Sequence, residues 1–104
     1  MAMAEGKRWT DDEIARLRAM YDGDALLTQM VDSLHRKDTT IMFRLSRILG
    51  RKVFEHTGRR WTATDMAGLA RVFVGDVAVK TAVDAMGRSP AAMASKRRVR
   101  RGAR

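Results

Sequence analysis

The apolar residues of this sequence recur at the spacing of an α-helix in three stretches before residue 50. In the first stretch Ile14, Leu17 and Tyr21 share one face of a 3.6-residue period. A second stretch that ends at Leu34 and a third that begins near Asp38 follow the same rule. Polar residues fill the positions between, so each stretch has one apolar stripe to bury. The pattern predicts three amphipathic helices.

Local signals suggest where these helices begin and end. Thr10 and Glu13 have the spacing of a capping box, in which the threonine oxygen accepts from the third amide and the acid reaches back. Gly23 suits a left-handed position at the end of the first helix. Asp24 is expected to cap the second helix, and a tight turn at residues 35–37 precedes the third.

A gapless internal match at an offset of 52 residues organises the chain. Trp9 and Thr10 fall on Trp61 and Thr62. Further pairs keep the same register: Glu13 on Asp65, Leu17 on Leu69, Tyr21 on Phe73, Gly23 on Gly75, Asp24 on Asp76, Val31 on Val83, Arg36 on Arg88, Ile41 on Met93 and Arg44 on Lys96. The match predicts three equivalent helices in the second copy, with Ser89 as the cap and Pro90 as the first residue of the last one.

We therefore expect an all-α fold of two tandem three-helix helix-turn-helix units joined by a basic linker. Residues 8–49 form the first repeat and residues 61–100 the second repeat, with residues 50–60 as the linker and 101–104 as a basic disordered tail. Trp9 and Trp61 are expected to anchor the two cores. The linker spans about 36 Å at most, close to one turn of B-DNA at about 34 Å, so both repeats could reach one duplex.

The net charge of +9 indicates a polyanionic partner, with nucleic acid favoured and an anionic membrane surface as the competitor. The excess is localised. Residues 35–60 hold eight Lys and Arg against two acids, and residues 88–104 hold seven against none, whereas the rest of the chain is mildly acidic. All the excess positive charge thus lies on the two third helices and the segments that follow them.

Several function classes find no support in the sequence. The chain has no cysteine and only two histidines, His35 and His56, so no metal site and no cofactor are expected. No glycine-rich phosphate loop, nucleophile elbow or acid–base pair is present, so we expect neither an enzyme nor a small-molecule substrate. No export signal or membrane span is visible. The expected location is the cytoplasm, on the nucleoid if the source is bacterial.

The two copies resemble Myb/SANT-type helix-turn-helix units. In the first copy the resemblance rests on the segments RWTDDEIARLRAMYDGD and SLHRKDTTIMFRLSRIL. In the second copy it rests on RWTATDMAGLARVFVGD and AMGRSPAAMASKRRVRR. They are most similar to short bacterial and phage versions with a W-T-x-x-E first helix and an L-G-R-S-P turn. Each copy has only the first of the three tryptophans of eukaryotic Myb repeats. The resemblance implies that the third helix enters the major groove and that the turn before it lies on phosphate.

The base-reading candidates are the outward positions of the third helices. Ile41, Leu45 and Ile48 share a face that we expect to be buried. In the second copy we expect Met93 to be buried in the same way. The remaining positions, which we expect to face bases, are Thr39, Met42, Phe43, Ser46 and Arg47, and then Ala91, Ser95 and Arg98. For Phe43, packing between the two copies is an equally good alternative. Ala94 is also expected to face outward.

The phosphate candidates are basic or hydroxyl side chains of the turns, third helices and linker. They are Arg36, Lys37, Arg44, Arg51, Lys52, Arg59, Arg88, Ser89, Lys96, Arg97, Arg100 and Arg101. Such contacts position a protein on DNA without reading its sequence. Since the second copy has few base-reading groups, we expect the first copy to discriminate between sequences and the second to clamp.

The leading hypothesis is a double-stranded DNA-binding protein, a transcriptional regulator. Because the duplication is direct, its site is expected to be asymmetric or directly repeated. The alternative is a SANT-like interaction module that binds RNA polymerase or another protein, which an exposed Met42 and Phe43 would favour. RNA is third, since an aromatic content of 6% offers few stacking platforms.

Overall fold

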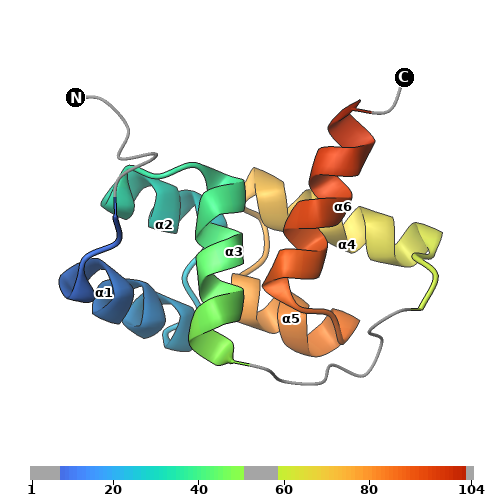
Figure 1. The fold of residues 1–104 in the computed structure, drawn as a ribbon. Coiled ribbons are helices and arrows are strands. Elements are labelled where there is room, and N and C mark those ends of the chain that lie inside the picture. The colour runs from blue at the N-terminus through green and yellow to red at the C-terminus, as the bar shows by residue number, and fades with distance from the viewer. Residues whose placement is uncertain (1–7, 51–58, 103–104) are drawn as a thin grey trace.

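The computed structural model describes residues 8–50 and 59–102, with side chains as far as Arg97, and its regular elements are α-helices (Figure 1). They are α1 (Asp11–Asp22), α2 (Leu27–Leu34), α3 (Asp38–Leu49), α4 (Ala63–Val74), α5 (Val79–Met86) and α6 (Pro90–Gly102). The bounds of α4 and α5 lie 52 residues after those of α1 and α2, and α6 begins 52 residues after α3. The all-α prediction and the helix positions are confirmed.

The capping predictions for the first helix of each copy are confirmed. The Glu13 amide donates to Thr10 Oγ1 at 3.1 Å, and Glu13 Oε1 accepts from the Thr10 amide at 3.0 Å. Thr62 and Asp65 form the same pair of hydrogen bonds, at 3.1 and 3.0 Å. Both helices therefore begin with two of their free amides satisfied.

The caps of the second helices differ from the prediction. Asp24 and Asp76 do not cap them; Leu26 and Ala78 precede these helices, without a side-chain cap. Gly75 is left-handed as expected, with φ of 86°, whereas Gly23 has φ of −89° and the next residue, Asp24, takes φ of 62° instead. Aspartate tolerates this region better than most side chains, so the turn places its left-handed residue one position later in the first copy.

The last helix begins as predicted and ends later. Pro90 is its first residue, and Ser89 Oγ accepts from the Ala92 amide at 3.1 Å. The helix continues through Arg101 to Gly102, so a disordered tail from residue 101 was wrong for these two positions. Residues 103–104 and linker residues 51–58 lie outside the described part of the chain.

The buried residues of both copies form a single cluster. Leu17, Leu45 and Ile41 of the first copy and Met93 of the second are fully buried in it. Trp9 and Trp61 are half-buried and pack against it. Ile41 and Met93 are thus inward, as predicted, and the two copies share one core.

The most extensive contacts between the copies are those of three helix pairs. The most extensive is between α3 and α6, which lie side by side and run in opposite directions (Figure 1). In addition α2 packs on α4 and α1 packs on α5. An isolated antiparallel bridge links Leu26 to Ala78, where the Val79 amide donates to the Ala25 carbonyl at 3.3 Å.

The end of α4 approaches α2 very closely at Gly75. A β-carbon added to Gly75 would lie 2.7 Å from Thr28 Oγ1 and 2.8 Å from Thr28 Cγ2. Glycine is therefore required there both by its left-handed backbone and by the proximity of the other copy.

Gly75→Ala is expected to lower the free energy of unfolding by about 2 kcal/mol or more, measured by chemical denaturation. Left-handed backbone costs a residue with a β-carbon about 1–2 kcal/mol, and the overlap with Thr28 adds to it. In a Thr28→Ala background the same change should cost the backbone strain alone. An equal cost in both backgrounds would contradict the packing of α4 on α2.

Candidate nucleic-acid interface

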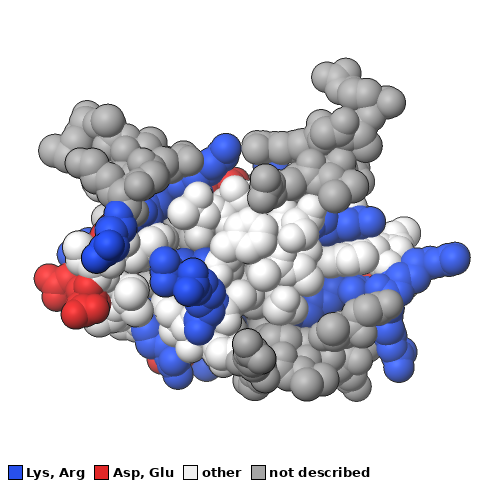
Figure 2. Space-filling model, in the orientation of Figure 1, with Lys and Arg blue, Asp and Glu red and all other residues white. Residues whose placement is uncertain are grey.

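The face that carries α3 and α6 is basic at its margins and uncharged at its centre. Figure 2 shows Lys and Arg on both sides of a central region without charged groups, while acidic side chains gather at the left edge, over the start of α1. The sequence places the excess cations on these two helices and the segments after them. Cations therefore flank the face on which α3 and α6 meet.

A second stripe of α3 is buried against α6. Thr39, Met42 and Ser46 follow one another at i, i+3 and i+7 along α3. The last of them is bonded to α6, since the Ala91 amide donates to Ser46 Oγ at 2.7 Å. Thr39 is 7% exposed and Met42 is fully buried.

The prediction that Thr39 and Met42 face outward is therefore wrong, as is the outward position of Ala94, which is fully buried. The prediction assumed that each third helix buries only one face, the face that packs on the other helices of its own copy. The structure gives α3 two such faces, because the other copy covers the second. The small side chains of Ala91 and Ala94 on α6 permit this close approach.

The remaining base-reading candidates cluster at one end of the α3–α6 pair. Phe43, Ser46 and Arg47 of α3, with Gly50 and Ala91, line a hollow of about 680 Å³. Arg47 is exposed, and Phe43, Ser46 and Ala91 are half-buried. Ser95 is exposed further along α6, and the side chain of Arg98 lies outside the described part. We call the hollow lined by Phe43, Ser46, Arg47, Gly50 and Ala91 the α3–α6 hollow.

The turn before α3 is fixed by a buried arginine. Arg36 is 2% exposed; its Nε donates to Glu13 Oε2 and its Nη2 to Glu13 Oε1, both at 3.1 Å. Its Cζ lies 4.2 Å from the centroid of the Trp9 ring. The carboxylate that caps α1 thus also neutralises the turn before α3.

The second copy repeats the arrangement with the matched residues. Arg88 is 3% exposed and its Nη2 donates to Asp65 Oδ2 at 3.2 Å. The same group donates to the Arg60 carbonyl at 3.0 Å, and Cζ lies 4.2 Å from the Trp61 centroid. Each copy therefore joins its tryptophan and its capping acid through one buried arginine.

These contacts correct the exposure expected of two phosphate candidates. Arg36 and Arg88 point inward and are engaged by carboxylates, so they do not present their charge to solvent. Sequence reasoning assigned Glu13 and Asp65 to capping alone. The signal that links them to the arginines is the joint recurrence of Trp, acid and Arg at the same offset.

The pKa values of both capping acids reflect these contacts. Hydrogen bonding from Arg36, followed by the Thr10 amide, lowers the pKa of Glu13 to about 2. The Thr62 amide, and then Arg88, lowers the pKa of Asp65. Both acids are therefore charged in the folded chain over the physiological range.

Two further cations, Arg44 and Lys96, lie near the same tryptophan rings as the buried arginines. Arg44 Cζ is 5.3 Å from the Trp9 centroid, and Lys96 Nζ is 6.0 Å from the Trp61 centroid. Burial, followed by the charges of Arg47 and Arg36, lowers the pKa of Arg44. Within residues 8–50 and 59–97 no carboxylate pairs with Arg44, Arg47 or Lys96. Arg44 is repelled by the two neighbouring arginines and would be stabilised by an added anion.

The other phosphate candidates fall in three groups. Lys37 and Arg59 are exposed, and Arg97 is half-buried with Cζ 4.5 Å from the Phe73 centroid. Ser89 is occupied as a helix cap. Outside the described part lie Arg51, Lys52 and the side chains of Arg100 and Arg101.

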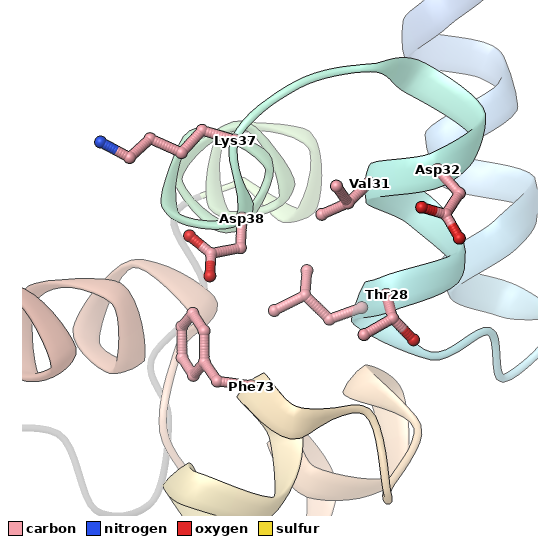
Figure 3. A pocket seen from close by; sticks show the side chains of 7 residues that line it. Thr28, Val31, Asp32, Lys37, Asp38 and Phe73 are labelled. Carbon is pink, nitrogen blue, oxygen red and sulfur yellow. The ribbon is translucent and has the colours of Figure 1, made fainter. Parts of the chain in front are cut away.

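A second hollow, of about 360 Å³, lies where α2, the start of α3 and the end of α4 meet (Figure 3). Leu27, Val31 and Phe73 make its apolar part, and Asp32 and Asp38 supply carboxylates. Two carboxylates against one lysine, Lys37, disfavour phosphate there.

The described residues contain no group of three His, Asp or Glu side chains arranged to hold a metal ion. Across the same ranges, no helix has the length and apolar character needed to span a membrane. Comparison with protein-family models, curated proteins and solved structures finds no match.

The depressed pKa of Glu13 makes stability depend on pH in the acid range. A folded-state pKa of about 2 against an ordinary 4.5 gives a stabilisation that is complete above about pH 4.5 and is lost as the pH falls toward 2. Glu13→Gln keeps a cap acceptor but not the charge. It should lower the free energy of unfolding by about 1–3 kcal/mol at pH 6, and its stability should fall less than that of the unmodified chain between pH 5 and pH 2.

Asp12→Asn is the matched control, because Asp12 is the exposed neighbouring acid and forms no ion pair in the described part. Denaturation at both pH values measures the difference. If Glu13→Gln and Asp12→Asn changed stability equally, the buried Arg36 pair would not have the energetic role assigned to it.

Proposed function

We propose that this chain binds double-stranded DNA with the face formed by α3 and α6, and that it acts as a transcriptional regulator built from two helix-turn-helix repeats. The observation that carries the proposal is the meeting of both third helices on one face with cations that no carboxylate neutralises in the described part. Each cation that meets a DNA phosphate releases a condensed counterion, which favours binding.

Arg44 and Lys96 are assigned to the phosphates. They occupy matched positions in the two copies, and each is held over a tryptophan ring instead of extending freely. A restrained side chain loses less conformational entropy when it binds. For Arg44, relief of the repulsion by Arg47 and Arg36 supplies further free energy once phosphate is present.

The α3–α6 hollow is assigned to the bases. Arg47 is exposed at its edge and has the fork of donors that matches guanine O6 and N7. The Phe43 ring next to it offers an apolar contact for a thymine methyl. Ser46 is already bonded to Ala91, so its main role is to hold α6 in place.

The packed helices limit how deeply they enter the groove. Two helices of about 10–12 Å diameter, packed about 8–10 Å apart, are together wider than a major groove of about 12 Å. We therefore propose that the pair lies over the groove and reaches it with long side chains, with Arg47 as the main reader.

A second candidate function is binding to another protein. The observations in its favour are the uncharged centre of the α3–α6 face (Figure 2) and the open hollow at one end of the helix pair, which half-buried Phe43 lines. An apolar centre inside a charged rim is typical of protein interfaces.

Salt dependence distinguishes the two functions. In fluorescence anisotropy with a labelled duplex, the logarithm of the binding constant should fall linearly with the logarithm of salt concentration. If Arg44, Lys96 and Arg97 each meet one phosphate, the slope is about −2.7 or steeper. A slope near zero, or absence of binding at low salt, would refute the DNA-binding proposal.

Single substitutions test the separate roles. Arg47→Ala should weaken binding to a preferred duplex about tenfold and to random DNA less, since a base contact contributes about 1–3 kcal/mol. Lys96→Ala should weaken both alike and reduce the salt slope by about 1. Arg18→Ala is the control of equal charge, because Arg18 pairs with Asp22 on α1 at 3.3 Å. Equal losses of preference for Arg47→Ala and Lys96→Ala would count against the assignment.

A further inference from the structure

The pattern of helix pairs that joins the two copies is kept when the copies are exchanged. Adding 52 to a residue of the first copy gives its equivalent in the second, so the exchange swaps α1 with α4, α2 with α5 and α3 with α6. It converts the α2–α4 contact into the α1–α5 contact, and both are present. The α3–α6 contact converts into itself.

Single residues obey the same rule. Leu26 and Ala78, which form the antiparallel bridge, are 52 residues apart and so exchange with one another. Met42 and Ala94, also equivalent, are both fully buried in α3 and α6. The two helices run in opposite directions (Figure 1), as a twofold axis perpendicular to both helices would relate them.

Residues at the edge of the interface between the copies are also related by the 52-residue exchange. Phe73 of α4 and Asp32 of α2 line one hollow (Figure 3). Their equivalents are Tyr21 of α1 and Asp84 of α5. These also lie near one another, since burial and then the charge of Asp84 raise the pKa of Tyr21.

An interface of this kind is isologous. Each copy uses the same surface toward the other, which occurs with a twofold axis, whereas a head-to-tail arrangement pairs two different surfaces. A direct repeat in sequence has therefore folded with an approximate twofold axis, as if it were a dimer within one chain. The axis passes between α3 and α6, through the face that the proposed function assigns to DNA.

We infer that the DNA site of this chain is a short duplex with approximate twofold symmetry, whose two strands are contacted by equivalent residues of the two copies. The inference rests on the proposed function and replaces the directly repeated site that the sequence suggested. The dyad of a duplex relates its two antiparallel strands, so a protein dyad that coincides with it places Arg44 and Lys96 on phosphates of opposite strands.

The geometry also fixes the spacing. The third helices are in contact, so the two half-sites adjoin and are not one helical turn of about 34 Å apart. The described chain measures 37 × 31 × 23 Å, which covers about one turn of duplex. The symmetry is only approximate, because Phe43 and Arg47 in the first copy are matched by Ser95 and Val99 in the second.

The test is selection of duplexes from a random pool by the full chain, followed by hydroxyl-radical footprinting. The selected motif should be an imperfect inverted repeat within about one turn. Protected positions on the two strands should be related by a twofold axis. Arg44→Gln should remove protection on one strand, and Lys96→Gln should remove it on the other strand at the same distance from the centre.

Four outcomes would overturn the inference. A motif of two half-sites in the same orientation, or loss of protection on the same strand in both variants, would show a direct arrangement while leaving DNA binding intact. Salt-dependent binding without any enriched motif would also refute it, because defined half-sites must be selectable. Absence of duplex binding altogether would refute the proposed function as well. The symmetry of the footprint is measured on the unmodified chain. The inference therefore remains testable even if Arg44→Gln folds poorly.

Discussion

The contact between α3 and α6 determines which side chains of this chain reach solvent. It buries Thr39, Met42 and Ala94, which a single repeat would expose, and it leaves Phe43 and Arg47 at the edge of an open hollow. It also joins two short apolar sets into one core, which matters because repeats of about 42 residues bury too little surface to be stable alone. Stability and the shape of the candidate interface thus have the same origin.

The buried arginines give the face its stability. Arg36 and Arg88 each connect a turn to the capped start of the first helix of the same copy, and each lies against a tryptophan. Breaking a buried ion pair is costly because it leaves one charge uncompensated. The helices that follow these turns are therefore held in position, and the cations beyond them, Arg44 and Lys96, are displayed from a rigid base.

The sequence was sufficient for whatever depends on local signals. Capping boxes, the Ser89–Pro90 start and the 52-residue register predicted the helices within one or two residues, except that α6 continues to Gly102. Local signals do not predict the second buried face of α3. Thr39, Met42 and Ser46 read as an ordinary mixed surface, and only the presence of α6 makes them interior. The Arg36–Glu13 pair was missed for a similar reason, because capping already accounted for the acid.

The central claim is that the two third helices are packed together in the free chain, before any partner binds. The most direct measurement is the nuclear Overhauser effect between the Ala91 amide proton and the Ser46 β-protons in the free protein. The account predicts a strong cross-peak, because that amide donates to Ser46 Oγ at 2.7 Å. A complete set of effects within α3 and within α6, with none between them, would contradict it.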